Sequence, residues 1–307
     1  MLDKLGLLHR FELIARHRSI RQAAEALRIS QPALSRSVRQ LEDMYGERLF
    51  ERKARGVVPT AFGQSLLAVA SRLTREWELV DAGLRRNTAM LEGTLRINAG
   101  PLWSSAIIPR ISGPLLEQYP GLVLEITNYT GELLIDMLNS SKVDVALGGK
   151  PLLGLRNEEF HTDIFTHVQD RVLARADHPI HAAGTDDFEA VHAYPWIAYS
   201  PYPNLVGETL HAVVERTGKA PPVRLRTSSL MALMRLMQEG DFLCMLPDAL
   251  VREITSPQLA PVPMNIGKAV YPSGASYRKS FKDYEPLKAT IQLCRQLFAD
   301  DNAPGAG

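Results

Sequence analysis

The sequence predicts an α/β protein in three parts. These are an N-terminal winged helix-turn-helix over residues 1–60, a long coiled-coil linker helix over 61–92, and a C-terminal domain of strands and helices over 93–299. Three observations predict this arrangement. Two helical segments near the start are separated by a break, apolar residues in the middle recur at heptad spacing, and strand and helix patterns alternate after residue 93. Residues 300–307 are expected to form a disordered tail.

The helix-turn-helix is predicted from residues 19–42 and from the segments beside them. A first helix is expected over Lys4–His17 and a short second one over Ile20–Leu27. After a break, Ser30 can cap a third helix, because its hydroxyl can accept a hydrogen bond from a free backbone N–H group. Pro32 fits the first turn of this helix, and Gly46 can end it. One face is apolar, at spacings of four, three and four: Leu34, Val38, Leu41 and Tyr45.

The opposite face of the third helix is polar and suits the major groove of DNA. It offers Gln31, Ser35, Arg36 and Arg39. The segment Arg48–Pro59 is short, basic and rich in strand-forming residues, which predicts a winged hairpin that places Arg52, Lys53 and Arg55 near phosphates. Residues 1–90 contain 16 Lys and Arg against 10 Asp and Glu, a net charge of +6, whereas the remainder has 19 against 24, a net charge of −5. A basic head favours a polyanionic partner, although without the helix-turn-helix ordinary surface charge would be the better interpretation.

A dense run of residues makes this N-terminal segment similar to a known family. The run is Ala23-Ala24, Ser30-Gln31-Pro32-Ala33-Leu34-Ser35, Leu41-Glu42, Gly46, Leu49-Phe50-Glu51-Arg52, Pro59-Thr60 and Gly63. In order and spacing it resembles the N-terminal domain of LysR-type transcriptional regulators, and the layout stays similar to about residue 296. The resemblance implies a double-stranded DNA operator with an interrupted inverted repeat.

The polar face and the resemblance together assign the DNA-binding residues. Gln31, Ser35 and Arg36 are expected to read base edges from a helix that begins at Ser30 and Pro32. The expected phosphate contacts are Arg21, Arg39, Arg52 and Arg55.

The linker segment carries a heptad seam that follows a helix cap at Thr60. Its residues are Phe62, Leu66, Val69, Leu73, Trp77, Val80, Leu84 and Leu91. About four repeats of this kind are typical of a coiled coil, so a second copy of the chain is the expected partner. The alternative is a single helix packed on its own domain, but a helix of ~45 Å at 1.5 Å per residue is long for that role. Gly93 is expected to end it.

The C-terminal domain contains repeated strand–helix units. The expected strands are Thr94–Ala99, Leu122–Asn128, Val143–Leu147, Arg171–Arg175, Trp196–Tyr199, Val223–Thr227 and Phe242–Leu246. This pattern predicts parallel sheets covered on both faces, and the span is long for one sheet. The resemblance implies two Rossmann-like lobes arranged as in periplasmic solute-binding proteins, with crossovers near Phe160–Val168 and Pro263–Val270. Lobe I would contain about 93–162 and 268–299, and lobe II about 163–267.

An effector site is expected where hydroxyl residues follow strands. Ser104, Thr130, Thr227 and Ser228 occupy such junctions, where helix N-termini can bind an anion. The alternative is that each hydroxyl only caps a helix. In the family, small effectors bind between the lobes at these junctions, which implies a small organic or aromatic acid here. Leu102 stands where many members carry Ser or Thr, and Trp103 and Tyr199 suit either the pocket or the core. The expected set is Leu102, Trp103, Ser104, Thr130, Tyr199, Ser200, Pro201, Thr227 and Ser228.

Other classes of function lack support in the sequence. We find no nucleophile elbow, P-loop or dinucleotide fingerprint, and we expect no catalytic residue, metal or cofactor beyond the effector. Cys244 and Cys294 match no metal or redox spacing, and no apolar run approaches the ~20 residues needed to span a bilayer. We therefore expect a cytoplasmic protein with no membrane partner.

The sequence is interpreted as that of a DNA-binding transcription regulator controlled by a small molecule. The resemblance adds a homotetramer built as a dimer of dimers, and contact with RNA polymerase when the protein activates. The alternative is a two-lobed small-molecule binder whose N-terminal helices only mediate oligomerisation. An enzyme with a DNA-targeting domain is a third interpretation.

Overall fold

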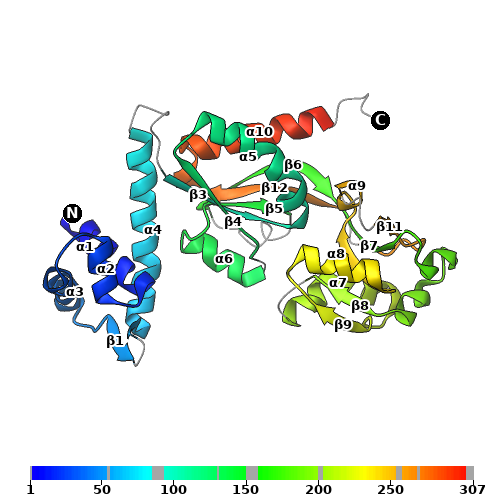
Figure 1. The fold of residues 1–307 in the computed structure, drawn as a ribbon, viewed down its shortest axis with the longest axis horizontal. Helices are drawn as coiled ribbons and strands as arrows, with labels where there is room; N and C mark the ends of the chain where they lie inside the picture. The colour runs from blue at the N-terminus through cyan, green and yellow to red at the C-terminus, as the bar shows by residue number, and fades with distance from the viewer. Residues whose placement is uncertain are drawn as a thin grey trace.

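The computed structural model describes residues 2–301, apart from 54–55, 85–92, 130, 150–157, 200–202, 254–257 and 268–269. A helical head and a larger α/β domain lie on opposite sides of one long helix, α4 (Ala61–Leu84) (Figure 1). Some of the expectations above lie outside the described residues. They concern Arg55, Leu91, Thr130, Ser200, Pro201 and the tail 302–307.

Three helices and a two-stranded wing form the head. They are α1 (Leu2–His17), α2 (Ile20–Ala26), α3 (Gln31–Tyr45), β1 (Phe50–Lys53) and β2 (Gly56–Pro59). Helix α3 begins where predicted, because the Ser30 hydroxyl accepts a hydrogen bond from the Ala33 N–H at 3.3 Å. It ends at Gly46, whose φ of 69° is the left-handed conformation of a C-terminal cap. The buried core of the head includes Phe11, Ile14, Ala23, Ala24, Leu34, Val38, Leu41 and Leu49.

Backbone contacts hold the wing against the helices. The Val57 N–H donates to the Arg18 carbonyl at 2.9 Å, and the Leu49 N–H donates to the Glu42 carboxylate at 2.8 Å. Gly56 lies at this contact with a φ of 122°, and a Cβ there would lie 2.1 Å from the Arg18 carbonyl oxygen. Both the backbone conformation and the close approach therefore require glycine at position 56.

Helix α4 has two faces with different contacts. Its start is capped by Thr60, whose hydroxyl accepts from the Gly63 N–H at 2.9 Å. The apolar stripe of the heptad seam packs on the head through Leu66 and Ala70. Other residues along the same stripe are exposed, namely Val69, Leu73, Trp77 and Val80. The other face carries the buried polar residues Ser71, Thr74 and Arg75, and Leu79, which packs in the core of the α/β domain.

The first sheet forms lobe I and has the strand order β4-β3-β5-β12-β6. The strands are β3 (Gly93–Ala99), β4 (Leu122–Thr127), β5 (Val145–Gly148), β6 (Phe160–Val168) and β12 (Tyr271–Arg278). Strands β3, β4 and β5 are parallel, and β12 runs antiparallel between β5 and β6. Helices α5 (Ile108–Gln118) and α10 (Glu285–Asp301) cover one face of this sheet, and α6 (Gly131–Asn139) covers the other (Figure 1).

The second sheet forms lobe II and has the order β11-β7-β10-β8-β9. Its strands are β7 (Asp170–Arg175), β8 (Trp196–Ala198), β9 (Val223–Arg226), β10 (Leu243–Pro247) and β11 (Leu259–Pro261), with helices α7 (Pro203–Thr217), α8 (Leu230–Glu239) and α9 (Leu250–Glu253). The short strand β11 was not expected from the sequence. Strand β6 pairs with β12 as far as Val168, so the first sheet continues past the lobe boundary expected near residue 163.

Both cysteines are buried free thiols, and burial raises the pKa of Cys244 and of Cys294 to about 12. Within the described ranges, no helix has both the length and the apolar character needed to cross a membrane.

Gly56→Ala should destabilise the head. The new Cβ meets the Arg18 carbonyl and the residue must hold a positive φ, so we expect a loss of about 1–3 kcal/mol of unfolding free energy. Gly6→Ala is the matched control, since Gly6 lies in α1 with nothing within 4 Å of an added Cβ. Alanine there should stabilise the helix by about 0.5–1 kcal/mol. Urea denaturation measures both, and a Gly56→Ala protein as stable as wild type would contradict the wing contact.

Candidate DNA-binding surface and effector cleft

The polar residues of α3 face solvent, and α3 lies on the outer side of the head, away from α4 (Figure 1). The exposed residues are Gln31, Pro32, Arg36 and Arg39, and Ser35 is half-buried. On the opposite face, the buried Ser37 hydroxyl accepts a hydrogen bond from the Arg10 guanidinium at 2.8 Å. Arg10 therefore ties α1 to α3, a role that the sequence did not reveal because the two residues are far apart in the chain.

The head carries further exposed cations outside α3. Arg18 and Arg28 lie in the turns on either side of α2, each with a positive φ, and Arg52 lies in the wing. Two other cations are paired on the surface, Arg21 with Glu25 at 3.9 Å and Lys53 with Glu51 at 3.0 Å. Exposed pairs of this kind contribute only about 0–1 kcal/mol, so they leave the cations available to a phosphate. Sequence reasoning did not single out Arg18 and Arg28, although both stand at helix breaks.

The carboxyl ends of β4 and β8 meet between the two lobes. Asn128, which follows β4, donates its side-chain N–H to the hydroxyl of Tyr199, which follows β8, at 3.0 Å. Burial raises the pKa of Tyr199, and the hydrogen bond from Asn128 acts in the opposite direction. Asn98 of β3 holds the same loop, because its side chain accepts from the Tyr129 N–H at 2.6 Å and donates to the Tyr129 carbonyl at 3.2 Å. Neither asparagine was predicted, although a polar residue at the carboxyl end of a parallel strand is a usable signal.

Trp103 belongs to the core, the second of the two interpretations that the sequence allowed. Its side chain is 2% exposed, and its indole N–H donates to the Ser273 hydroxyl at 2.9 Å. The rings of Phe165 and Phe298 pack beside it. Leu102 is also buried, so both residues belong to the core.

Most hydroxyl residues at the strand–helix junctions make local hydrogen bonds to the backbone, and one has an exposed side chain. Ser104 lies in the π-helical segment Trp103–Ile107, and its hydroxyl donates to the Pro101 carbonyl at 3.1 Å. Thr227 accepts from the Ser229 N–H at 3.0 Å, and Ser229 caps α8 by accepting from the Ala232 N–H at 3.2 Å. Ser228 lies between them with its side chain exposed.

Two histidines in lobe II contact backbone groups of the same lobe. Nδ1 of His178 accepts from the Ile180 N–H at 3.0 Å, and burial lowers the pKa of this imidazole. His181 contacts the Arg175 carbonyl at 3.0 Å. Across the described part of the chain, no three His, Cys, Asp or Glu residues gather as metal ligands.

A basic winged helix-turn-helix, a long helix and two lobes that meet at the Asn128–Tyr199 hydrogen bond define a class of protein. They are the parts of a one-component transcription regulator, in which one chain binds DNA and senses a small molecule.

The comparisons place the chain within this class. The family model described as "LysR substrate binding domain" matches residues 88–299, and "Bacterial regulatory helix-turn-helix protein, lysR family" matches residues 5–64. The chain belongs to the LysR family and is a LysR-type DNA-binding transcriptional regulator with an effector-binding domain.

Two relatives agree with this assignment, and one solved structure shares the fold. The chain is 30% identical to the SDS degradation transcriptional activation protein of a Pseudomonas species, over 98% of this chain and 97% of that one. It is 25% identical to the HTH-type transcriptional regulator PcaQ of Agrobacterium fabrum, over 97% and 96% of the two chains. Its fold is similar to full-length OxyR from Pseudomonas aeruginosa, with a TM-score of 0.70 at 21% identity over 95% of this chain and 97% of that one.

Proposed function

We propose that α3 enters the major groove of an operator and that its exposed face reads the base sequence. The observation that carries this proposal is a helix, capped by Ser30, that presents Gln31 and Arg36 to solvent. Gln31, Ser35 and Arg36 would contact base edges, with Pro32 in the first turn. The phosphate contacts would be Arg21, Arg39, Arg52 and Arg55, joined by Arg18 and Arg28.

Base reading and phosphate contact predict different mutant behaviour. Gln31→Ala and Arg36→Ala should each weaken binding to the chain's own upstream region by about 1–3 kcal/mol, and Gln31→Ala should leave binding to random DNA nearly unchanged. Arg52→Gln should weaken both equally and lower the slope of log affinity against log salt by about one. Mobility-shift titrations at several salt concentrations measure both effects. Equal losses of Gln31→Ala on the two DNAs, or an unchanged slope for Arg52→Gln, would remove that residue from the contact set.

We further propose that a second copy of the chain covers the exposed face of α4. This face borders an apolar groove of about 560 Å³ between α1, the end of α3 and α4. The groove is lined by Leu5, Leu8, Met44, Tyr45, Leu73 and Trp77. Trp77 and Val80 are 47% and 51% exposed, which leaves large apolar side chains for a partner to bury. The family resemblance extends this dimer to a dimer of dimers.

Leu73→Glu should abolish dimerisation, because it places a charge in the seam where no partner charge compensates for its desolvation. Operator binding should fall with it, since the two reading heads would no longer be held together. Ala68→Glu is the matched control, because Ala68 is exposed on α4 but lies off the seam. Light scattering measures the mass of each variant. A Leu73→Glu protein of wild-type mass would refute the proposed interface.

The effector proposed for this regulator is a small organic or aromatic acid that binds between the lobes. Polar groups from both lobes support the location, since Asn128 and Tyr199 meet there and Ser228 has an open hydroxyl. Leu102 and Trp103 would shape the cleft from behind, and Ser104 and Thr227 would hold its turns. Thr130, Ser200 and Pro201 join the set through the family resemblance. We propose no resident metal or cofactor.

A thermal-shift screen of the full chain against small organic acids tests this site. For an acid that stabilises the wild type, Ser228→Ala should weaken affinity about tenfold, the value of one charge-assisted hydrogen bond of ~1.4 kcal/mol. Ser229→Ala should instead lower the unfolding free energy by about 1 kcal/mol and keep ligand affinity, because Ser229 is a helix cap. Calorimetric titration beside a denaturant melt separates the two effects. Wild-type affinity of Ser228→Ala would exclude that hydroxyl from the site.

We infer that the protein acts in the cytoplasm, where it meets chromosomal DNA and, as an activator, RNA polymerase. No catalytic activity is proposed, and the two relatives named above are regulators. The alternative function, a small-molecule binder whose N-terminal helices only mediate oligomerisation, predicts no operator shift in the mobility assay.

A further inference from the structure

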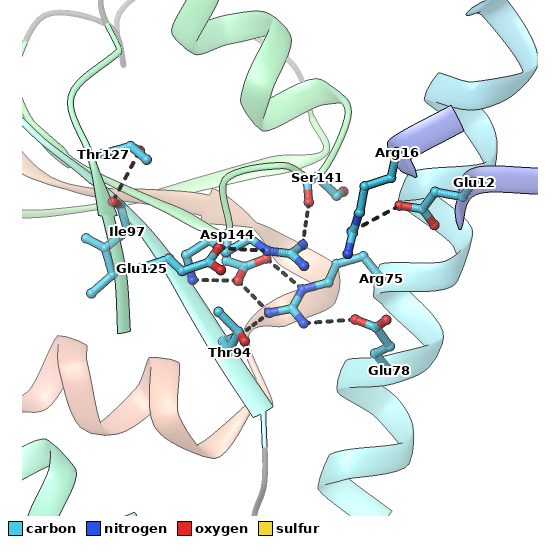
Figure 2. Close-up of polar contacts among 11 residues, drawn as sticks. Glu12, Arg16, Arg75, Glu78, Thr94, Ile97, Glu125, Thr127, Ser141 and Asp144 are labelled. Atoms are coloured by element: carbon cyan, nitrogen blue, oxygen red, sulfur yellow. Dashed lines mark hydrogen bonds and ion pairs between the residues drawn. The ribbon is translucent and has the colours of Figure 1, made fainter. Parts of the chain in front are cut away.

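A buried ion pair fastens α4 to lobe I. The Arg75 guanidinium donates from Nε to Oδ1 of Asp144 at 2.9 Å and from Nη2 to Oδ2 at 2.5 Å, so the two groups meet as a fork. Their side chains are only 6% and 1% exposed. Arg75 also donates to the Thr94 carbonyl at 2.5 Å and to Glu78 at 3.0 Å (Figure 2). The guanidinium therefore has acceptors on both the helix and the sheet.

Asp144 is itself fixed to the sheet of lobe I. Its carboxylate accepts from the Arg96 N–H at 2.9 Å, and its own N–H donates to the Arg96 carbonyl at 2.9 Å. Thr94 and Arg96 belong to β3, and Asp144 immediately precedes β5. The ion pair thus ties α4 to the amino ends of two neighbouring parallel strands.

A second pair on the same helix shows what is special about this one. Arg72 lies one turn earlier and reaches Glu159 at 4.0 Å, with side chains 36% and 49% exposed. Such an exposed pair is screened by water and holds no single geometry. A buried fork gains little net stability but leaves an unpaired buried charge if it shifts, so it favours one geometry. The contact is therefore better suited to fixing orientation than to adding stability.

The strands lead from this contact to the cleft. From Thr94 to Asn98, β3 spans about 13 Å at ~3.3 Å per residue. Asn98 holds the backbone of Tyr129, next to the Asn128 side chain that bonds Tyr199 of lobe II. Strand β3 therefore carries the α4 contact near one end and, through Asn98, holds the loop of the lobe–lobe contact at the other.

We propose that Arg75 and Asp144 are positioning residues that hold the linker helix, and with it the DNA-binding head, in the orientation on lobe I that this structure has. Strand β3 joins this contact to the Tyr129 loop, which meets lobe II through Asn128. The proposal goes beyond the assigned DNA and effector contacts, since neither residue touches DNA or the cleft.

The test measures the orientation directly, without an effector. Spin labels are attached to full-length chains carrying Asp43→Cys in the head and Gln292→Cys in lobe I, both at exposed positions. Cys244 and Cys294 are buried, so the labels react at the introduced thiols. Labelled chains are mixed with an excess of unlabelled chains, so that pulsed electron resonance reports distances within one chain.

Arg75→Lys should broaden the label-to-label distance distribution at least twofold, because an ammonium keeps the charge but cannot make the fork and reach Thr94 and Glu78 together. Asp144→Asn should also broaden the distribution, because the neutral amide removes the negative charge and one of the two acceptor oxygens of the fork. Arg72→Lys, the matched control, should keep the wild-type distribution. Affinity for a single operator half-site should stay within twofold in all three, which shows that the head remains folded and that the DNA-binding function is intact.

Two results would overturn the proposal. One is a wild-type distribution in both Arg75→Lys and Asp144→Asn. The other is equal broadening in Arg72→Lys, which would show that the effect is not specific to the buried fork. Loss of half-site binding by the wild type would instead count against the DNA contacts, and would leave the distance measurement as a separate result.

Discussion

Helix α4 has to satisfy three environments at once, and the arrangement of the whole chain depends on how it does so. Leu66 and Ala70 pack on the head, Leu79 enters the core of lobe I, and the seam of Leu73 and Trp77 faces solvent in the single chain. One apolar stripe of the helix packs on its own head near the start of α4 and remains open to a partner further along. The face toward lobe I carries polar residues beside Leu79, and the structure makes this contact specific by adding a buried ion pair to the apolar packing.

Local signals account for most of what the sequence predicted. Ser30 and Gly46 bound α3 because a cap hydroxyl and a left-handed glycine act on neighbouring backbone groups. The strands of both lobes likewise follow from short apolar runs, and the heptad spacing of α4 reports a helix whatever it packs against. Spacing does not say which partner covers which stripe. The pattern therefore indicated one seam, whereas Leu66 is buried within the chain and Leu73 is exposed.

The contacts that the sequence did not reveal join residues distant in the chain. Arg75 and Asp144 are 69 residues apart, and Asn128 and Tyr199 are 71 apart. On a helix, Arg75 beside Glu78 has the pattern of a solvated face. In the cleft, hydroxyl residues at strand ends suit caps and ligand contacts equally well, and only the structure separates the capping Ser229 from the exposed Ser228. Trp103 was ambiguous for a similar reason, because an aromatic side chain suits a pocket and a core alike.

The chemistry of the two long-range contacts explains how one chain can bind DNA and still respond to a ligand. Apolar packing is non-directional, so a head held to lobe I by apolar contact alone would slide among many orientations of similar energy. A buried fork that shifts leaves an unpaired buried charge, which is costly, so it favours one geometry. The Asn128–Tyr199 hydrogen bond is neutral, and it lies at the site proposed above for the effector. Under these two proposals, a ligand would rearrange the contact between the lobes, while the buried fork would keep α4 aligned with β3.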